Sequence, residues 1–265
     1  MTNVPAPPTP PSLPEYPPGR NLLAGKTVLV TAAAGTGIGF ATAKRAVEEG
    51  ARVVVSDIHE RRLQEAADRL GSNAHAVLGD VTVEDDVQRL VDTAVELGGG
   101  QLDVLVNNAG LGGTARLTEM TDEQWSSVLD VTLTGTMRMT RAALRHMGGQ
   151  RGGAIVNNAS VVGWRAQEGQ SHYAAAKAGV MALTRCAAIE AAEHNVRVNA
   201  VAPSLAMHPF LAKVTTEELL AELETREAFG RAAEPWEVAN VIIFLASDLA
   251  SYMTGEVISV SSQHP

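Results

Sequence analysis

A serine, a tyrosine and a lysine are spaced in this chain like a group that moves a proton to or from a substrate oxygen. Ser160, Tyr173 and Lys177 follow the pattern Ser-x12-Tyr-x3-Lys. Tyr173 and Lys177 share one face if they lie on a helix, so the ammonium can sit beneath the phenol. Ser160 ends an apolar run, and from the end of a strand its hydroxyl can reach the same oxygen. Because Tyr-x3-Lys occurs often by chance, the rest of the chain must place these residues together.

The elements that would position them follow a regular alternation from residue 25 onward. Continuous apolar strands separated by helical patterns indicate a parallel sheet covered on both faces. No break in composition interrupts this alternation, which predicts one doubly wound α/β domain over 21–265, with a seven-stranded parallel sheet and helices on both faces. Strands are predicted at 27–31, 52–56, 74–78, 102–106, 154–158, 197–201 and 257–260, and helices near 37–49, 59–70, 83–98, 121–147, 171–194 and 235–246.

Composition excludes several classes of partner. The net charge of -9 argues against nucleic acid or an anionic membrane. No apolar run approaches the roughly 18 residues of a membrane helix, and the first residues lack the features of a signal peptide. The single cysteine, Cys186, forms no internal disulfide and fits a reducing cytoplasm. We expect a cytoplasmic protein in which Cys186 is packed within a helix.

The first 20 residues hold eight of the twelve prolines. Proline fixes its φ angle and donates no backbone hydrogen bond. We therefore expect residues 1–20 to form an extended, disordered arm. A solvated tail is the favoured interpretation, and a docking peptide for a partner is the alternative.

A glycine-rich turn follows the first predicted strand and opens a helix. Glycines let the backbone approach a pyrophosphate, and the helix N-terminus offers free N–H groups. Asp57 ends the second strand, where a carboxylate accepts hydrogen bonds from an adenosine ribose and repels a 2′-phosphate; a solvated loop acid is the alternative. Thr36 stands where an Arg or Lys would bind that phosphate. The pattern predicts a Rossmann-type NAD site that includes Gly35, Thr36, Gly37, Ile38, Gly39 and Asp57.

The third and fourth predicted strands also end in residues suited to this cofactor. The carboxylate of Asp80, followed by Val81, can meet the adenine amine, and an N-cap of the next helix is the alternative. Asn107, Ala109 and Gly110 belong to an Asn-Asn-Ala-Gly element. Small residues there let the chain pass beneath the ribose, and Asn107 can tie neighbouring strands together. Ligands of open α/β sheets bind at these carboxyl ends.

These ordered motifs resemble those of the short-chain dehydrogenase/reductase family over about residues 21–261. The resemblance implies an NAD-dependent oxidoreductase that interconverts a secondary alcohol and a ketone, with Ser160, Tyr173 and Lys177 as catalytic residues. Tyr173 is then the acid and base, with its pKa lowered by Lys177 and the oxidised nicotinamide, and Lys177 holds the nicotinamide ribose. The resemblance also implies a homotetramer. We name no metal-binding residue.

Two of three departures from the family pattern concern the loop and the long helix. The glycine-rich loop begins Thr31-Ala32 instead of Thr-Gly and carries one extra residue. Thr132 stands where the family has a structural and proton-relay asparagine. A relay through its hydroxyl and simple helix packing are both open.

The third departure follows the sixth strand. Pro203 and Ser204 replace a Pro-Gly pair and lead into Leu205, and His208 replaces a threonine that usually meets the nicotinamide amide. For His208, a ligand-facing role and a loop contact are both open. All four residues complete the predicted cofactor set.

A closer resemblance, carried by residues 157–167, 227–238 and 255–265, is to actinobacterial reductases of steroid-ring degradation. Members of that group act on a CoA-linked hydroxy-methyl-oxo-indene carboxylate, which implies a bicyclic CoA ester as substrate. A 3-oxoacyl thioester reductase is the alternative enzyme, and an NAD-binding regulator is the alternative without catalysis.

Motif position places the substrate contacts and a covering lid. The segment 205–225 interrupts the alternation just after the cofactor site, so we expect a mobile lid there. Because CoA is anionic and the protein acidic, local cations are needed, with Arg116, Arg165 and Lys213 as candidates. The predicted substrate residues are Leu111, Val162, Trp164, Gln167, His172 and Phe210.

Overall fold

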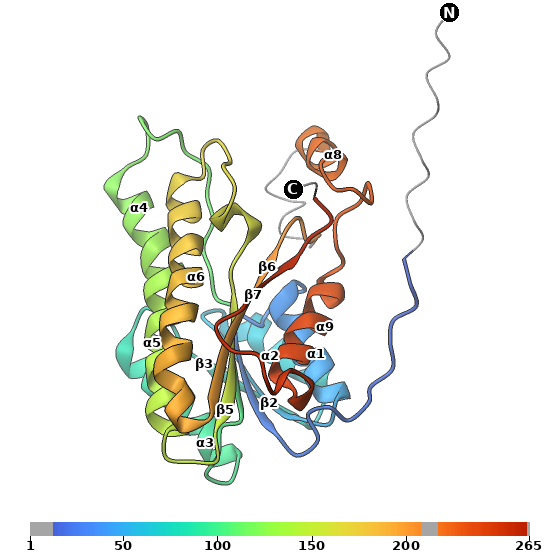
Figure 1. Cartoon of the computed structure of the whole chain (residues 1–265), viewed down its shortest axis with the longest axis vertical. Helices are drawn as coiled ribbons and strands as arrows, with labels where there is room; N and C mark the ends of the chain where they lie inside the picture. The colour runs from blue at the N-terminus through green and yellow to red at the C-terminus, as the bar shows by residue number, and fades with distance from the viewer. Residues whose placement is uncertain (1–12, 208–216, 264–265) are drawn as a thin grey trace, which may run out of the picture.

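A computed structural model of the chain describes residues 13–207 and 217–263 (Figure 1). The predicted sheet is confirmed: seven parallel strands lie in the order β3-β2-β1-β4-β5-β6-β7. The strand order reverses between β1 and β4, which places a ligand crevice at their carboxyl ends. The strands are β1 Thr27–Thr31, β2 Arg52–Asp57, β3 Ala74–Leu78, β4 Val104–Asn107, β5 Gly153–Asn158, β6 Val196–Pro203 and β7 Val257–Val260.

Helices cover both faces of the sheet, as predicted. α1, α2 and α9 pack on one face, and α3, α5 and α6 on the other (Figure 1). Successive strand side chains point to opposite faces, so Val28 and Val30 join the first core and Leu29 the second. Among the described residues, no helix is both long enough and apolar enough to cross a bilayer. The helices are α1 Ile38–Glu48, α2 Glu60–Leu70, α3 Glu84–Leu97, α4 Asp122–Leu129, α5 Gly135–Met147, α6 Ser171–Ala191, α8 Glu217–Thr225 and α9 Pro235–Ala246.

Some element boundaries differ from the expected ones. The helix predicted at 121–147 is divided into α4 and α5 by a π-helical turn, Asp130–Thr134, because an extra residue in one turn leaves no mark on a short apolar pattern. β4 begins at Val104 and not at Leu102, whose backbone N–H donates to the Gln150 side chain. α8 lies in the segment expected to be a lid.

The part of the proline-rich arm that the structure describes is docked on the domain. Residues 13–20 form no helix or strand, but Tyr16 anchors them. Its hydroxyl donates to Glu48 at 2.5 Å, and its ring packs edge-on against Trp236 with 5.4 Å between centroids. Lys44 Nζ lies 4.3 Å from the centre of the same ring. The proline content predicted the extended backbone but not this contact with α1 and α9.

Cys186 lies on α6, but its side chain is exposed and not packed as expected. Thr184, Ala187 and Ala188 occupy the buried positions of this turn of the helix. The expectation failed because a mostly apolar helix offers no clear polar face from which to tell its buried side.

Candidate active site

The three residues that opened the sequence analysis lie together at the carboxyl ends of the strands. Ser160 follows β5, while Tyr173 and Lys177 occupy the first turns of α6. Ser160 is close enough to act on the Tyr173 hydroxyl, where its hydrogen-bonding influence favours a lower pKa of the phenol. Lys177 Nζ lies 5.5 Å from the centre of the Tyr173 ring. The spacing therefore produces the expected cluster on one helix face, beside the end of a strand.

Burial dominates the protonation of this cluster. The Lys177 side chain is 3% exposed, and burial lowers its pKa to about 8. Burial raises the pKa of Tyr173, and the influence of Ser160 only partly opposes this. The direction is opposite to the expected one because removal from water disfavours the phenolate. Lys177 Nζ donates to the backbone oxygen of Asn158 at 2.5 Å.

The glycine-rich loop has the geometry of a dinucleotide cradle. A Cβ on Gly39 would lie 2.4 Å from Asn108 Nδ2 and 2.5 Å from the Ala32 oxygen, so only glycine allows this close packing. Gly37 caps α1 without a side-chain hydrogen bond, and the first turn holds no acidic residue. The N–H groups at this helix start are thus suited to a pyrophosphate.

Asp57 ends β2 beside this loop. Its Oδ2 accepts the Ala34 N–H at 3.2 Å, and its Oδ1 accepts the His59 N–H at 3.1 Å. Burial raises the pKa of Asp57, while hydrogen bonds and nearby Arg62 act in the opposite direction. The carboxylate is thus held at the rim of the loop, where an adenosine ribose fits. Together with the glycine cradle, it makes the site compatible with a nicotinamide dinucleotide.

Two asparagines of this site were missed by the sequence analysis. Asn108 Nδ2 donates to the backbone oxygens of Thr31 and Ala32 at 3.2 and 3.1 Å. Asn158 Nδ2 donates to Asn108 Oδ1 at 2.9 Å, and the Asn158 backbone oxygen accepts a hydrogen bond from Lys177 Nζ. These bonds connect the loop to Lys177. The signal was the Asn-Asn pair that ends each of two adjacent strands.

Asn107 ties neighbouring elements together as predicted. Its Nδ2 donates to Asn157 Oδ1 of β5 at 2.9 Å and to Thr140 Oγ1 of α5 at 3.0 Å. Its neighbours Ala109 and Gly110 lead the chain away from β4. A Cβ on Gly110 would lie 3.4 Å from Lys177 Nζ, so this turn passes close to the lysine.

Asp80 closes a local turn. Its Oδ1 accepts the N–H and the hydroxyl of Thr82 at 2.8 and 2.7 Å. The N-cap of α3 is Val83, so the N-cap interpretation of Asp80 is wrong. Val81 is buried against Gly135 of α5.

Thr132 fastens the loop after β4 to the π-helical turn. Its hydroxyl accepts the Leu111 N–H at 2.9 Å and donates to the Leu111 oxygen at 3.2 Å. Because a hydroxyl carries one proton, this contact occupies its donor. Thr132 thus does more than pack within a helix.

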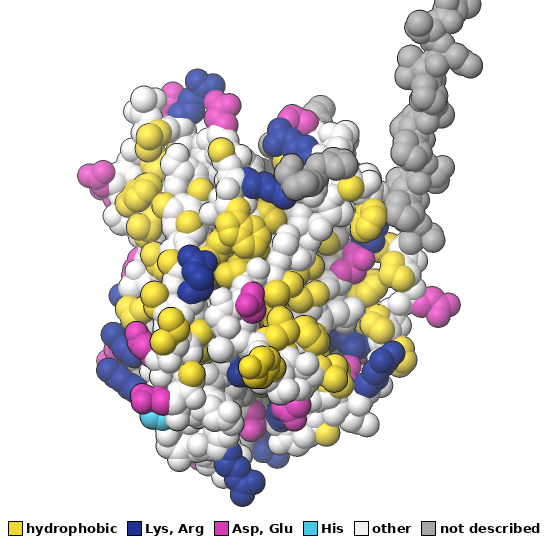
Figure 2. Space-filling view, viewed as in Figure 1, with side chains coloured by type: hydrophobic (Ala, Val, Ile, Leu, Met, Phe, Trp, Pro, Cys, Tyr) yellow, Lys and Arg dark blue, Asp and Glu magenta, His cyan; other side chains and the backbone are white. Residues whose placement is uncertain are grey.

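The predicted substrate residues that the structure describes differ in exposure. Trp164 and Leu111 are exposed, Val162 and Gln167 are half-buried, and His172 is buried. Figure 2 shows a notch at the upper edge of the molecule, between the lobe with α4 and the lobe with α8. Pro203 ends β6 on this side, and Ser204 and Leu205 follow it. His208, Phe210 and Lys213 lie outside the described residues.

The two cations expected to meet CoA have partners within the chain. Arg116 pairs with Glu168 at 3.1 Å, and both side chains are exposed. Arg165 donates to the Gln263 side chain. Arg165 is therefore held by a neutral group, whereas Arg116 faces a carboxylate.

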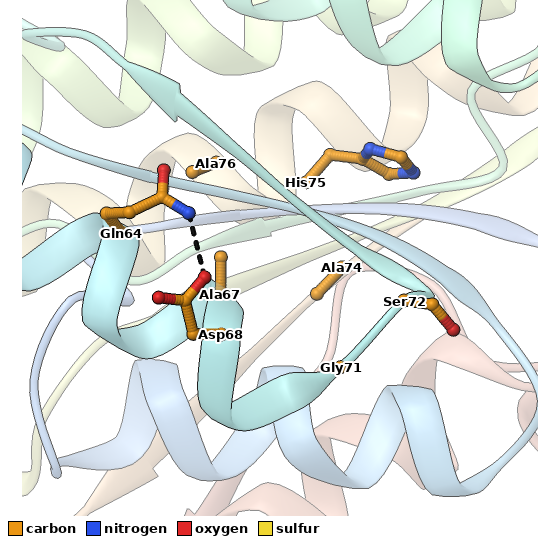
Figure 3. Close-up of a pocket in the computed structure, with 8 residues that line it drawn as sticks. All are labelled: Gln64, Ala67, Asp68, Gly71, Ser72, Ala74, His75 and Ala76. Atoms are coloured by element: carbon orange, nitrogen blue, oxygen red, sulfur yellow. Dashed lines mark hydrogen bonds between the residues drawn. The ribbon is translucent and has the colours of Figure 1, made fainter.

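A separate hollow of about 530 Å³ lies between α2 and β3 (Figure 3). Gln64 and Asp68 bond to each other on one side at 2.9 Å, and His75 of β3 lines it as well. Ala74 marks the amino end of β3, whereas Ser160 and Asp57 follow carboxyl ends. This hollow is remote from the catalytic cluster.

Fold and site together define an oxidoreductase of the nicotinamide-binding, doubly wound class. A family model described as enoyl-(acyl carrier protein) reductase matches residues 32–262. A crystal structure of a short chain dehydrogenase from Mycobacterium smegmatis has a TM-score of 0.85 and 59% identity, covering 96% of this chain and 99% of that one. The chain belongs to the short-chain dehydrogenase/reductase family.

Two curated relatives bear on the substrate. The chain is 63% identical over 252 residues to the (5R,7aS)-5-hydroxy-7a-methyl-1-oxo-2,3,5,6,7,7a-hexahydro-1H-indene-carboxyl-CoA reductase of Mycobacterium tuberculosis, covering 93% of this chain and 96% of that protein. It is 42% identical over 241 residues to a 3-oxoacyl-[acyl-carrier-protein] reductase of Thermotoga maritima, covering 90% and 97%. Both are reductases, and the first is markedly more similar.

Proposed function

We propose that this oxidoreductase interconverts a ring alcohol and a ketone on a bicyclic CoA-linked carboxylate, with NAD as cofactor. The observation that carries the proposal is the cluster of half-buried Tyr173 with buried Ser160 and Lys177, in a chain 63% identical to an indene-carboxyl-CoA reductase. The 3-oxoacyl thioester alternative has the support of a more distant relative only. A regulator without catalysis is disfavoured, because all three catalytic residues are present and brought together.

The proposed chemistry assigns one task to each catalytic side chain. Tyr173 donates its hydroxyl proton to the ketone oxygen during reduction and recovers it during oxidation. Ser160, close to Tyr173, donates a hydrogen bond to the same oxygen. Lys177 supplies positive charge beneath the phenol and holds the nicotinamide ribose. The cofactor, when bound, supplies or accepts the hydride.

Because the pKa of Tyr173 is raised, forming its phenolate requires nearby positive charge. Burial favours the neutral phenol, the form that acts as the acid in reduction. Oxidation needs the phenolate, so positive charge must then be close to it. Lys177 is the cation beside the ring, and its protonated form assists the ionisation of Tyr173.

Asp57 supports NAD over NADP. Its carboxylate lies at the end of β2, where it accepts the ribose hydroxyls and repels a 2′-phosphate. Arg62 is close enough to favour the charged form of Asp57, but it is the Asp57 carboxylate that lies at the rim of the glycine-rich loop. We assign the adenine end to Asp80 and Val81 on the same reasoning from strand ends.

The substrate residues remain those expected from motif position. Trp164 and Leu111, exposed near the catalytic cluster, are proposed to contact the bicyclic ring. Arg165 is the better candidate of the two described cations for CoA, because its partner Gln263 is uncharged. Arg116 would have to leave Glu168. The CoA proposal therefore depends chiefly on Arg165 among the described residues.

The deciding experiment compares two substrates with two cofactors. We would measure turnover of the CoA-linked hydroxy-indene and of a linear 3-hydroxyacyl-CoA, with NAD and with NADP. Faster turnover of the bicyclic ester with NAD is expected. Preference for the linear thioester would replace the proposed substrate. Tyr173→Phe should bind NADH and lose about 10²-fold or more of the turnover, and near-normal turnover in this variant would refute the catalytic assignment.

A further inference from the structure

Glu227 is a buried carboxylate outside the catalytic cluster. It follows α8, and its side chain is 4% exposed. Within the described part of the chain it forms no ion pair; nearby Arg231 is engaged by Glu237 through two hydrogen bonds of 2.7 and 2.8 Å. A buried charge without a cation is costly unless hydrogen bonds compensate it. Hydrogen bonds must therefore compensate the buried charge of Glu227.

Three donors from two separate segments meet this carboxylate. Its Oε2 accepts the hydroxyls of Ser204 at 3.1 Å and Ser262 at 2.8 Å. Its Oε1 accepts the Leu205 N–H at 3.3 Å. Hydrogen bonds to an ionised acceptor are stronger than those between neutral groups. The carboxylate thus holds both segments through its two oxygens.

Two of these donors and the carboxylate itself bracket the segment expected to cover the substrate. Ser204 precedes that segment, Leu205 begins it, and Glu227 follows it shortly after its end. Additional backbone bonds close the same base: Met207 N–H donates to the Ala233 oxygen, and Ala233 N–H to the Leu205 oxygen. The two ends of the segment are therefore joined, with the Glu227 carboxylate as the side-chain link.

The third donor brings the C-terminal tail into the same arrangement. Ser262 lies just after β7, and its backbone oxygen receives the Ala228 N–H at 2.6 Å. The next residue, Gln263, forms an antiparallel β-bridge with Glu227, and its side-chain oxygen accepts a hydrogen bond from Arg165. Arg165 belongs to the loop after Ser160. The tail thus connects Glu227 to the loop that follows Ser160.

We propose that Glu227 is a positioning residue, which holds residues 204–207 and the C-terminal residues 262–263 in the arrangement that binds substrate. The inference rests on the proposed function for the identity of that substrate. Glu227 touches neither the catalytic cluster nor Asp57, so it acts through the backbone of Ser204 and Leu205 and through the tail. Its loss should weaken substrate binding more than it slows the chemical step.

The test compares Glu227→Ala with Glu227→Gln. Alanine removes all three bonds, and we expect the KM for the preferred CoA substrate to rise about tenfold or more with a smaller change in kcat. Glutamine keeps an oxygen for the Leu205 N–H, and its amide can donate to the serine oxygens, so KM should return toward the wild-type value. Glu65→Ala, at an exposed position of α2 paired with Arg61, is the matched control.

Hydrogen–deuterium exchange without substrate provides an independent readout. In Glu227→Ala, faster exchange is expected in peptides covering 204–207, 226–230 and 257–263, and unchanged exchange in β1 and α1. Unchanged exchange in the first three peptides, or an equal rise throughout the molecule, would overturn the proposal. Because no substrate is needed, this result stands apart from the substrate comparison, whose failure would refute only the proposed function.

Discussion

At the residue scale, the ammonium group of Lys177 is buried. Its folded pKa of about 8 lies below the ordinary 10.5, so the folded protein releases this proton first as pH rises. The unfolded state binds more protons between these values, and the free energy of unfolding therefore rises with pH in that window. The full effect is about 3 kcal/mol.

The measurement is urea denaturation at several pH values from 7 to 10, for the wild type and Lys177→Met. The wild type should gain stability relative to the variant as pH rises above about 8. The low-pH side of this window is where burial of the charged lysine costs most. A constant difference between the two proteins would contradict the assigned burial effect.

Ala32 has a backbone angle that suits glycine better. Its φ is +52°, in the left-handed region, at the position where the family usually has glycine. A Cβ in this region costs about 1–2 kcal/mol, and the added flexibility of glycine in the unfolded chain costs about 0.5–1 kcal/mol. Ala32→Gly should thus raise the free energy of unfolding slightly, by up to about 1 kcal/mol.

Ala182→Gly, at an exposed position of α6, is the control for this substitution. Glycine in a helix interior should lower stability by about 1 kcal/mol. Thermal and urea unfolding of both variants measure these changes in stability. If Ala32→Gly lost as much stability as the control, the left-handed angle would carry no strain.

At the element scale, one aromatic ring contributes to the docking of residues 13–20, beside the hydrogen bonds from Arg45 to the Pro17 oxygen at 2.8 Å and from the Arg20 N–H to Glu49 at 2.7 Å. Tyr16 combines an edge-on contact with Trp236 and cations from α1 beside its ring. Such pairs contribute about 0.5–1.5 kcal/mol each, so Tyr16→Ala should lower the free energy of unfolding by about 2 kcal/mol. Tyr16→Phe keeps the ring and should lose about 1 kcal/mol or less. Equal losses in urea denaturation would show that the Glu48 hydrogen bond, not the ring, holds the segment.

The elements were more predictable than the contacts between them. β1 and α9 follow from local signals, an apolar strand and a Glu-Pro helix start, and the structure has them at the expected positions. Ser160, Tyr173 and Lys177 were found because their spacing is itself local. Asn108, Glu227 and the docking of Tyr16 were missed, since each depends on partners far away in the chain.

At the scale of the whole molecule, exposed apolar residues are available to form contacts in the homotetramer that the family resemblance implies. Ile189 on α6 is 81% exposed, and Leu249 and Tyr252 are exposed in the segment that precedes β7. The family resemblance places subunit contacts on the helices at 121–147 and 171–194 and on the C-terminal segment. Isolated exposed apolar residues are ordinary, so only a measurement of mass can decide.

Light scattering should give a mass of four chains, each of 27.8 kDa. Ile189→Asp places a charge on the outer face of α6, where burial without a partner is costly, and should shift the protein toward smaller assemblies. Val83→Asp, at an exposed apolar position before α3 and away from the proposed contacts, should leave the mass unchanged. A monomeric wild type would refute the tetramer. An Ile189→Asp protein with unchanged mass would exclude this part of α6 from the interface.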